Sequence, residues 1–572
     1  MNALQNVHEA SNAATPRRPT HRGLAILGSF ITALTASLTS AVAHADMPPP
    51  PPPVAPTTVA PAPIVVPAPA AVDPLPGTAP IGDGTSSVSV TAAPAHDYWR
   101  EHQAGYLGGQ FYLRSDDDAF ILYPMARLQM DTYAYGGPGV SDFQTGNGTG
   151  LKDSMFAKRA RVEMQGRFMK DWFFMLAGDF AVGSLSATET VTPNAIPTDI
   201  FIGYEACKMF AVQVGQFDIP FSNENLWTDK FFDFMERSLT VRSIGAPYNK
   251  DTGIMFVGEN GDRNKGQYGY AVAVISGDGQ NIRNPDNRVD VTGRIFVRPL
   301  AGKGGGMEQF HIGLSGRFGE RDPAYVRYDA PSLSTPGGYK FFASNYKTTL
   351  NGVSTTMHII PDANQAALGA DFFLPLGAFD LKGELVYLSE GRREAIDDGT
   401  GASKAGDIQR TGTLSGISYY VQAAYWLFGK PRYNPGNPGI GSLPKKKLEE
   451  KWWDNSLQIV GRWEQVALKY NSTDRNTQVV QTPSGLDGDI KVNDFQLAAN
   501  FWASKHVRLT LEWSVYMFTG TPPKDPGFKT ATDKNQAGAP GSGVIDSNGT
   551  GKVFGANAST LHEISARIAI AI

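Results

Sequence analysis

The chain has 572 residues, a formal net charge of −4 and 41% hydrophobic residues. A charge this close to zero gives no basic field, which excludes nucleic-acid binding driven by electrostatics. The single cysteine, Cys207, excludes an intrachain disulfide framework and a cysteine-ligated zinc site. The 62 glycines and 11% aromatic residues instead suit a β-protein with many turns.

The first 45 residues have the pattern of an export signal. A basic region ending at Arg22 precedes an uncharged apolar stretch over residues 24–38, and Ala43-His44-Ala45 has the small-residue spacing of a cleavage site. We predict a signal peptide over residues 1–45. A single anchoring transmembrane helix is the alternative, because the uncharged stretch is long enough to be considered for one.

A proline-rich segment follows the predicted signal. Fourteen of the residues between Met47 and Ile81 are proline. Such a composition cannot pack a core and favours an extended polyproline II form. We predict that residues 46–104 are a disordered periplasmic linker; an arm that approaches the cell wall is a sharper alternative.

Segments of about ten residues with period-two alternation begin near residue 119. In residues 158–168, charged or polar side chains occupy every second position and mostly apolar ones the positions between. Successive side chains of a strand point to opposite faces of the sheet, so this pattern predicts a strand with one polar face. The alternation recurs in 289–298, 379–387, 507–516 and at the C-terminus.

About sixteen such strands are expected. They begin near residues 119, 156, 172, 199, 209, 252, 268, 289, 307, 366, 379, 416, 456, 491, 507 and 560. The connections between them alternate between short and long, as in transmembrane barrels, which have short turns at one end and long loops at the other. We predict an all-β transmembrane antiparallel barrel over residues 105–572 with about 16 strands, or 18 if residues 339–360 contain another hairpin. A soluble all-β protein is the alternative.

Closure and strand number connect this fold with a function. Lipid offers no hydrogen-bond partner to an open sheet edge, so a spanning sheet must close. With about sixteen strands, a barrel encloses an aqueous lumen that side chains do not fill. The expected register turns several basic side chains toward that lumen: Arg159, Arg161, Arg167, Arg294 and Arg298. Arginine suits phosphate and carboxylate groups, so these residues are candidates for an anion path, with ordinary lumen lining as the alternative.

The third long connection, residues 220–251, is unusually aromatic. It contains Phe221, Trp227, Phe231, Phe232 and Phe234. Such a loop is expected to fold inward, pack on the barrel wall and narrow the lumen. Its basic residues Lys230, Arg237 and Arg242 would then tune which ions pass, unless they only pair with the acidic residues of the same loop.

A series of short motifs resembles the phosphate-selective porin O and P family over roughly residues 115–572. In chain order these motifs are Phe156-Ala157-Lys158-Arg159-Ala160-Arg161, Asp171-Trp172, Val214-Gly215-Gln216-Phe217, Pro220-Phe221, Phe234-Met235-Glu236-Arg237-Ser238, Asp251-Thr252-Gly253, Gly461-Arg462-Trp463 and residues 500–511. The resemblance implies a sixteen-stranded, trimeric outer-membrane porin with an inward third loop and small anions such as phosphate as solutes.

The sequence therefore predicts an outer-membrane porin for passive diffusion of small polar solutes. No enzymatic activity and no cofactor are expected, because the metalloprotease, serine-hydrolase and P-loop motifs are absent. The expected partners are outer-membrane lipid, small anions, two further copies of the chain and, through the linker, the cell wall. A structural or adhesion protein that tethers the envelope through its proline-rich arm is the alternative.

Overall fold

The computed structural model describes most of the chain beyond residue 101. The described residues are 102–107, 110–136, 153–181, 195–261, 266–304, 306–322, 333–337, 340–342, 345–350, 353–396, 410–429, 455–474, 488–504, 506–519 and 560–572. The predicted signal peptide, residues 1–45, and nearly all of the predicted linker, residues 46–104, lie outside them. The described residues belong to one compact unit, Ala92–Ile572.

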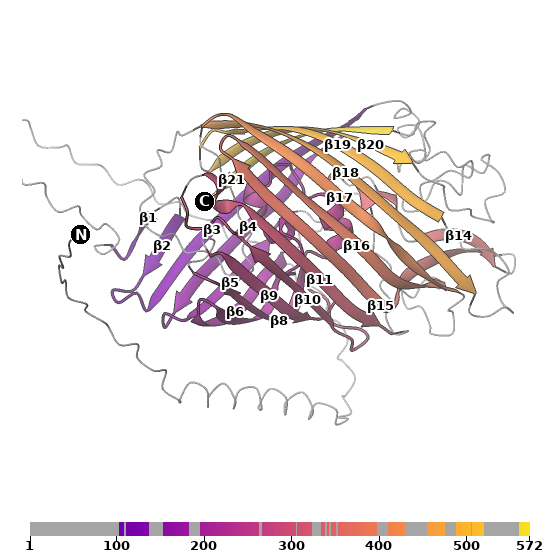
Figure 1. The fold of residues 1–572 in the computed structure, drawn as a ribbon, viewed down its shortest axis with the longest axis horizontal. Coiled ribbons are helices and arrows are strands. Elements are labelled where there is room, and N and C mark those ends of the chain that lie inside the picture. Colours follow the sequence, from indigo (N-terminus) through magenta and orange to yellow (C-terminus); the bar gives the residue numbers. More distant parts are fainter. Residues whose placement is uncertain are drawn as a thin grey trace, which may run out of the picture. The chain divides into compact units, whose positions relative to one another are not determined.

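Sixteen antiparallel strands form a closed barrel (Figure 1). Its first nine strands are β3 (Phe120–Gly136), β4 (Ser154–Phe168), β5 (Trp172–Asp179), β6 (Ile196–Cys207), β7 (Phe210–Asp218), β8 (Lys250–Glu259), β9 (Tyr268–Ile275), β10 (Asp290–Val297) and β11 (His311–Arg321). The other seven are β15 (Val353–Leu376), β16 (Phe379–Ile396), β17 (Arg410–Phe428), β18 (Ser456–Asp474), β19 (Gly488–Trp502), β20 (Val507–Thr519) and β21 (Thr560–Ala571). β21 pairs back to β3 and closes the barrel.

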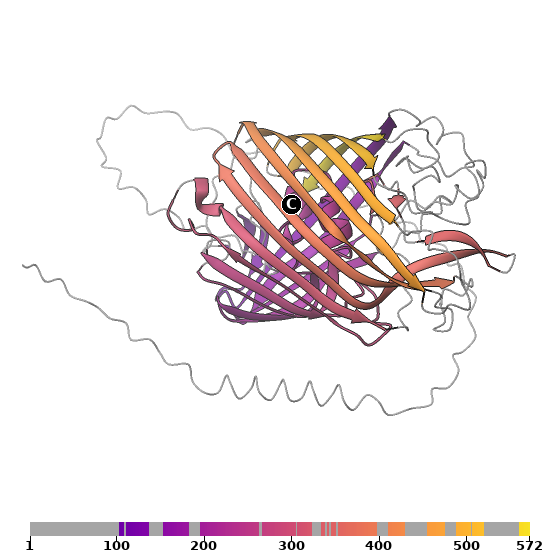
Figure 2. The ribbon, with the colours of Figure 1, turned by 45° about the vertical axis from the view of Figure 1, so that its right-hand side comes forward.

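The predicted all-β class and the strand count of sixteen are confirmed, and the alternative of eighteen barrel strands is wrong. A hairpin does occur near residues 345–358, where β14 (Asn345–Leu350) pairs with the start of β15. However, β15 continues without a break into the barrel, so this hairpin extends the sheet beyond the barrel wall (Figure 2). It adds no strand to the closed ring.

A few short elements accompany the barrel. β1 (Ala104–Leu107) and β2 (Gln110–Arg114) form a hairpin that pairs with the start of β3, and β12 (Leu333–Ser334) pairs with β13 (Lys340–Phe342). The short helices are η1 (Glu224–Leu226), η2 (Asp229–Phe231), η3 (Thr240–Gly245) and η4 (Gly306–Gln309). Among the described residues, no helix is long and apolar enough to cross a bilayer.

The two ends of the barrel differ in their connections. At the turn end, β4–β5, β6–β7 and β15–β16 are joined by only two or three residues. In the two-residue β15–β16 turn, Gly377 has a φ of +74°, a conformation that glycine adopts without strain. The last residue, Ile572, exchanges two backbone hydrogen bonds of 2.9 Å with Ala126 at this end. Most of the long connections lie at the opposite, loop end, but β10 and β11 are joined at the turn end by thirteen residues, 298–310. The β17–β18 connection also joins strand ends at the turn end, and its residues 430–454 lie outside the described residues.

The strand alternation separates an apolar exterior from a polar interior. On β20, Leu509, Leu511 and Trp513 point outward and are 42%, 59% and 38% exposed, while the intervening side chains are buried inside the barrel. The outer surfaces of β4, β10 and β21 carry exposed apolar residues in the same way. This exterior can contact lipid hydrocarbon, whereas the charged side chains between them face the lumen.

Candidate functional site

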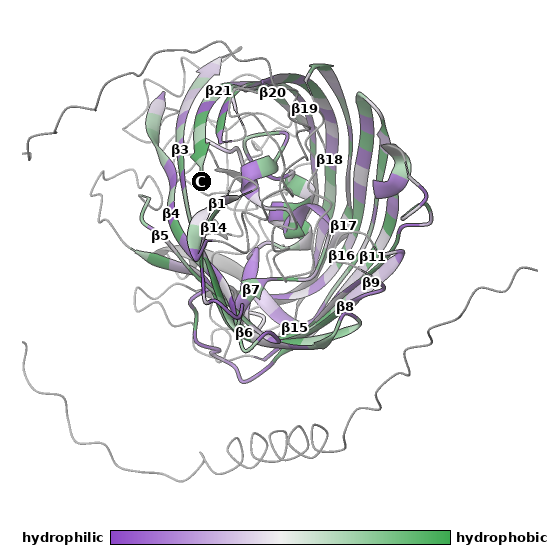
Figure 3. Cartoon of the chain, turned by 90° about the vertical axis from the view of Figure 1, so that its left-hand side faces the viewer, coloured by the Kyte–Doolittle hydropathy of each residue, from purple (hydrophilic) through white to green (hydrophobic). Residues whose placement is uncertain are grey.

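The third long connection folds into the lumen. We call residues 219–249 the inner loop; its short helices lie inside the ring of strands when the barrel is viewed along its length (Figure 3). Phe221, Leu239 and Ile244 are at most 1% exposed and belong to one apolar cluster with side chains of the barrel wall, including Val386 and Val466. The predicted inward fold of this aromatic-rich loop is confirmed, and burial of its apolar side chains provides the driving force.

Close packing at this contact requires a glycine. A Cβ atom on Gly245 would lie 2.8 Å from the ring of Phe221 and 3.4 Å from Val386 on β16. Because the first distance is shorter than real Cβ contacts allow, any larger residue would push the inner loop away from the wall. The sequence around the inner loop thus specifies its fit against β16.

Carboxylates of the wall bind the backbone of the inner loop. Glu384 on β16 accepts a hydrogen bond from the Glu224 amide at 2.7 Å, and Glu512 on β20 accepts one from the Met235 amide at 2.8 Å. Glu464 on β18 accepts from the Leu239 amide at 3.0 Å and also from the next amide. Buried backbone amides are costly to leave without an acceptor, so these three glutamates position the loop.

Donors from neighbouring strands bind the loop carbonyls. The Asn500 side-chain amide donates to the carbonyl of Asp233 at 2.7 Å. Arg508 donates to the carbonyl of Phe232, and Arg567 donates to that of Met235. Three backbone carbonyls of the Phe232–Met235 segment therefore have hydrogen-bond donors from the wall, which fixes this part of the loop.

The acidic residues of the inner loop are neutralised by wall residues. Asp229 forms ion pairs with Arg127, Arg159 at 2.8 Å and Arg161 at 3.3 Å. Glu236 accepts two hydrogen bonds from Arg159, at 2.7 and 2.8 Å, and is 2.8 Å from Arg567. The loop is consequently bound electrostatically to β3, β4 and β21 on one side.

Asp233 binds the other side of the lumen. Its carboxylate pairs with Lys382 on β16 and accepts hydrogen bonds from Gln422 on β17 at 2.6 Å and Gln458 on β18 at 2.8 Å. The Lys382 ammonium also lies 3.8 Å from the centre of the Trp227 ring, a close cation–π contact. The inner loop thus spans the lumen and is held by opposite walls.

The three basic residues predicted for the inner loop have different surroundings. Lys230 lies 3.4 Å from a carboxylate oxygen of Glu163 on β4. Arg237 donates to three carbonyls of its own loop, those of Glu224, Asn225 and Trp227, at 3.1–3.3 Å. Arg242 donates to the carbonyls of Arg237 and Ser334. The basic and acidic side chains of the loop therefore do not pair with one another among the described residues.

The five arginines predicted to line the lumen all carry carboxylate partners. Arg159 and Arg161 are bound to the inner loop as described, and Arg167 pairs with Glu205. Arg294 pairs with Asp371 at 2.6 Å, and Arg298 pairs with Glu259 at 2.7 Å. The side chains of the last two pairs are at most 4% exposed, whereas those of Arg159, Arg161 and Arg167 are 10%, 15% and 20% exposed.

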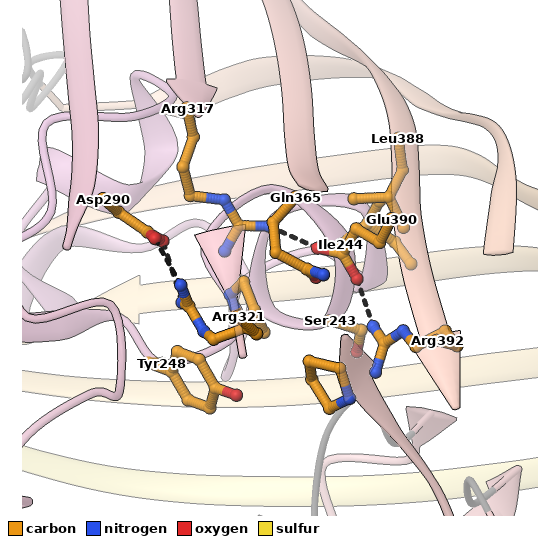
Figure 4. Close-up of a pocket in the computed structure, with 12 residues that line it drawn as sticks. Ser243, Ile244, Tyr248, Asp290, Arg317, Arg321, Gln365, Leu388, Glu390 and Arg392 are labelled. Atoms are coloured by element: carbon orange, nitrogen blue, oxygen red, sulfur yellow. Dashed lines mark hydrogen bonds and ion pairs between the residues drawn. The ribbon is translucent and has the colours of Figure 1, made fainter. Parts of the chain in front are cut away.

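A further cluster of arginines lies beside the inner loop at the loop end (Figure 4). Arg317 donates to Glu390 at 2.8 Å, Arg392 pairs with the same carboxylate, and Arg321 donates to Asp290 at 2.6 Å. Arg321 and Arg392 were not among the expected site residues, because the sequence pattern ends strands β11 and β16 before them.

A second loop segment also enters the lumen. Residues 333–337 contact the wall opposite β11: Lys158 donates to the carbonyl of Pro336 at 3.3 Å, and Glu563 accepts from the Gly337 amide at 3.2 Å. Thr335 is 2% exposed. This segment has no periodic pattern in the sequence, so its inward position is not predictable from the residues alone.

A match to a protein family agrees with this architecture. Residues 137–515 match the family model described as phosphate-selective porin O and P. No curated protein matches the chain. Similar solved structures include OmpT of Vibrio cholerae, with 8% identity over 80% of this chain and 99% of that one at a TM-score of 0.40.

Two other solved structures have comparable similarity. The outer-membrane channel DcaP of Acinetobacter baumannii has 11% identity over 80% of this chain and 99% of that one, with a TM-score of 0.39. The anion-selective porin of Comamonas acidovorans has 11% identity over 79% of this chain and 100% of that one, with a TM-score of 0.37. The family match covers most of the chain and confirms the resemblance of its motifs. The chain therefore belongs to the phosphate-selective porin O and P family and is a bacterial outer-membrane β-barrel channel rather than an enzyme.

Proposed function

We propose that this porin passes small polar solutes by passive diffusion and favours anions such as phosphate. The observation that carries the preference is a guanidinium group without a carboxylate partner. Arg237 of the inner loop is partly exposed and donates only to backbone carbonyls; within the described part of the chain, it forms no ion pair. Its positive charge is therefore available to a passing anion.

The surroundings of Arg237 strengthen the argument. Its guanidinium lies 4.7 Å from the centre of the Phe232 ring, a cation–π contact that positions the group without neutralising its charge.

The same proposal covers orientation and assembly. The turn end faces the periplasm, as in other transmembrane barrels, and the loop end faces outward. Residues 1–45 are the export signal and residues 46–104 a periplasmic linker that can reach the cell wall. We propose that the barrel assembles as a homotrimer in outer-membrane lipid, as the family resemblance implies.

Planar-bilayer recordings in a chloride gradient test the preference. Wild-type channels should show a reversal potential that favours chloride, and added phosphate should reduce the chloride current. Arg237→Gln should move the reversal potential toward that of the cation. Lys303→Gln, which removes one charge from an exposed turn, is the control and should not. Wild-type channels without ion preference would contradict the anion proposal.

A further inference from the structure

The exposed part of the lumen lies along one wall. On β8–β11 and β15–β21, the lumen-facing side chains that the structure describes are buried, among them Met255, Arg294, Glu464 and Ser565. On β4–β6, by contrast, the partly exposed lumen-facing side chains are Lys158, Arg161, Gln165, Arg167, Met175, Asp179 and Glu205. Water therefore reaches the inner face of β4–β6 and is excluded from most of the remaining wall.

The strand register places these side chains in pairs along one face. Arg161 is the direct partner of Asp179 across β4 and β5, and Gln165 is the partner of Met175. The Arg161 and Asp179 groups are 2.7 Å apart and each is 15% exposed. Nearer the turn end, Arg167 pairs with Glu205, and these side chains are 20% and 14% exposed.

Ion pairs elsewhere on the lumen wall are less exposed than the two pairs on β4–β6. The side chains of Arg567 and Asp131 are both 0% exposed, and those of Arg298 and Glu259 are 2% and 0% exposed. The charges of a buried ion pair are inaccessible to solutes, so such a pair has a structural role. The two partly exposed pairs of β4–β6 are accessible to ions in the water phase.

The inner loop forms the opposite side of this exposed strip. Lys230 reaches Glu163, the lumen-facing residue between Arg161 and Gln165 on β4, and is itself 15% exposed. The direct partner of Glu163 on β5 is Ala177, the smallest side chain on that face. The basic group of Lys230 thus faces the strip at a position where the wall side chain on β5 is small.

We infer that solutes cross the barrel along this strip, which we call the β4–β6 path, between the inner loop and strands β4–β6. The Arg161–Asp179 and Arg167–Glu205 pairs lie in series along it and contribute to its charge selectivity together with Lys230. The buried arginines of the remaining wall, including Arg294 and Arg298, hold the barrel together and do not contact the solute. The inference rests on the proposed function, because it presumes that the barrel conducts.

Substituted-cysteine accessibility tests this path. In a Cys207→Ser background, Gln165→Cys and Met175→Cys place a thiol on the path, whereas Ser565→Cys places one on the buried wall of β21. Each purified, heat-modifiable protein is recorded in a planar bilayer while 2-sulfonatoethyl methanethiosulfonate is added. We expect stepwise loss of current for the two path variants and unchanged current for Ser565→Cys.

The outcomes separate the two proposals. Loss of current in Ser565→Cys, or no loss in both Gln165→Cys and Met175→Cys, would overturn the β4–β6 path while leaving the porin function intact. Folded protein that never conducts, including the Cys207→Ser background, would instead overturn the proposed function and the path with it.

Discussion

Arg567 offers the sharpest test of how the inner loop and the barrel seam are stabilised together. It lies on β21, directly opposite Asp131 on β3 where the barrel closes, and donates two hydrogen bonds to that carboxylate at 2.6 and 2.7 Å. It also contacts Glu236 at 2.8 Å and the carbonyl of Met235 in the inner loop. Arg567→Met removes all of these contacts with little loss of volume.

The expected cost follows from burial. Removing one partner of a buried ion pair costs about 3–5 kcal/mol, mainly because the remaining charge is left uncompensated. Asp131 would be that charge, since Glu236 keeps its two hydrogen bonds from Arg159. Arg567→Met combined with Asp131→Asn should therefore recover roughly half of the loss.

Urea unfolding in lipid vesicles measures this effect, with heat-modifiable migration reporting the folded barrel. Arg288→Met is a matched control, because Arg288 and its partner Glu320 are 46% and 52% exposed. Exposed ion pairs are worth about 1 kcal/mol or less, so this variant should unfold almost as the wild type does. The reasoning is refuted if Arg567→Met is as stable as Arg288→Met, or if adding Asp131→Asn lowers stability further.

Three other predictions concern conduction. Asp179→Asn should raise the anion-to-cation permeability ratio, and Arg161→Gln should lower it. Each change should be roughly fivefold, because one charge about 4 Å from an ion in water is worth about 1 kcal/mol. Reversal potentials that shift in the same direction for both variants would contradict this prediction. Glu464→Ala leaves two inner-loop amides without an acceptor, at a cost of about 1–3 kcal/mol. The inner loop should then be held less firmly, and the open-channel current should become noisier. An unchanged noise spectrum would contradict the role of the wall in holding the loop. Ala177→Phe should reduce single-channel conductance by narrowing the β4–β6 path, and full conductance in the folded variant would place the path elsewhere.

The barrel was predictable because its two faces meet different solvents. Lipid on one side and water or polar contacts on the other enforce period-two alternation, and residues 158–168 display it in β4. The alternation fails where the backbone departs from a regular ladder. Between Arg159 and Ala157 the register with β3 shifts, so Lys158 is an extra residue and also reaches the lumen.

The start of β15 was misplaced for a related reason. The pattern suggested a start near residue 366, whereas the strand begins at Val353 and its register with β16 shifts between Pro361 and Gln365. Proline cannot donate to the ladder and commonly marks such an irregularity. A local pattern therefore stops at the bulge, although the strand continues through it.

The lumen contacts were the least predictable part. Arg567 and Asp131 are 436 positions apart in the sequence and meet only because the barrel closes. The charges of the inner loop could be recognised, but their partners on β3, β4, β16 and β21 depend on how far the loop reaches across the lumen. The exposure that distinguishes Arg161 from Arg294 likewise results from tertiary packing and leaves no signal in either strand's sequence.

Single-channel recording of the purified, heat-modifiable protein in a planar bilayer tests the central claim most directly. A sixteen-stranded barrel with a hydrated strip beside its inner loop should produce discrete current steps whose size scales with salt concentration. Insertion of folded protein without any current steps would contradict the account, because the lumen would then be closed by the same contacts that we describe as leaving the β4–β6 path open.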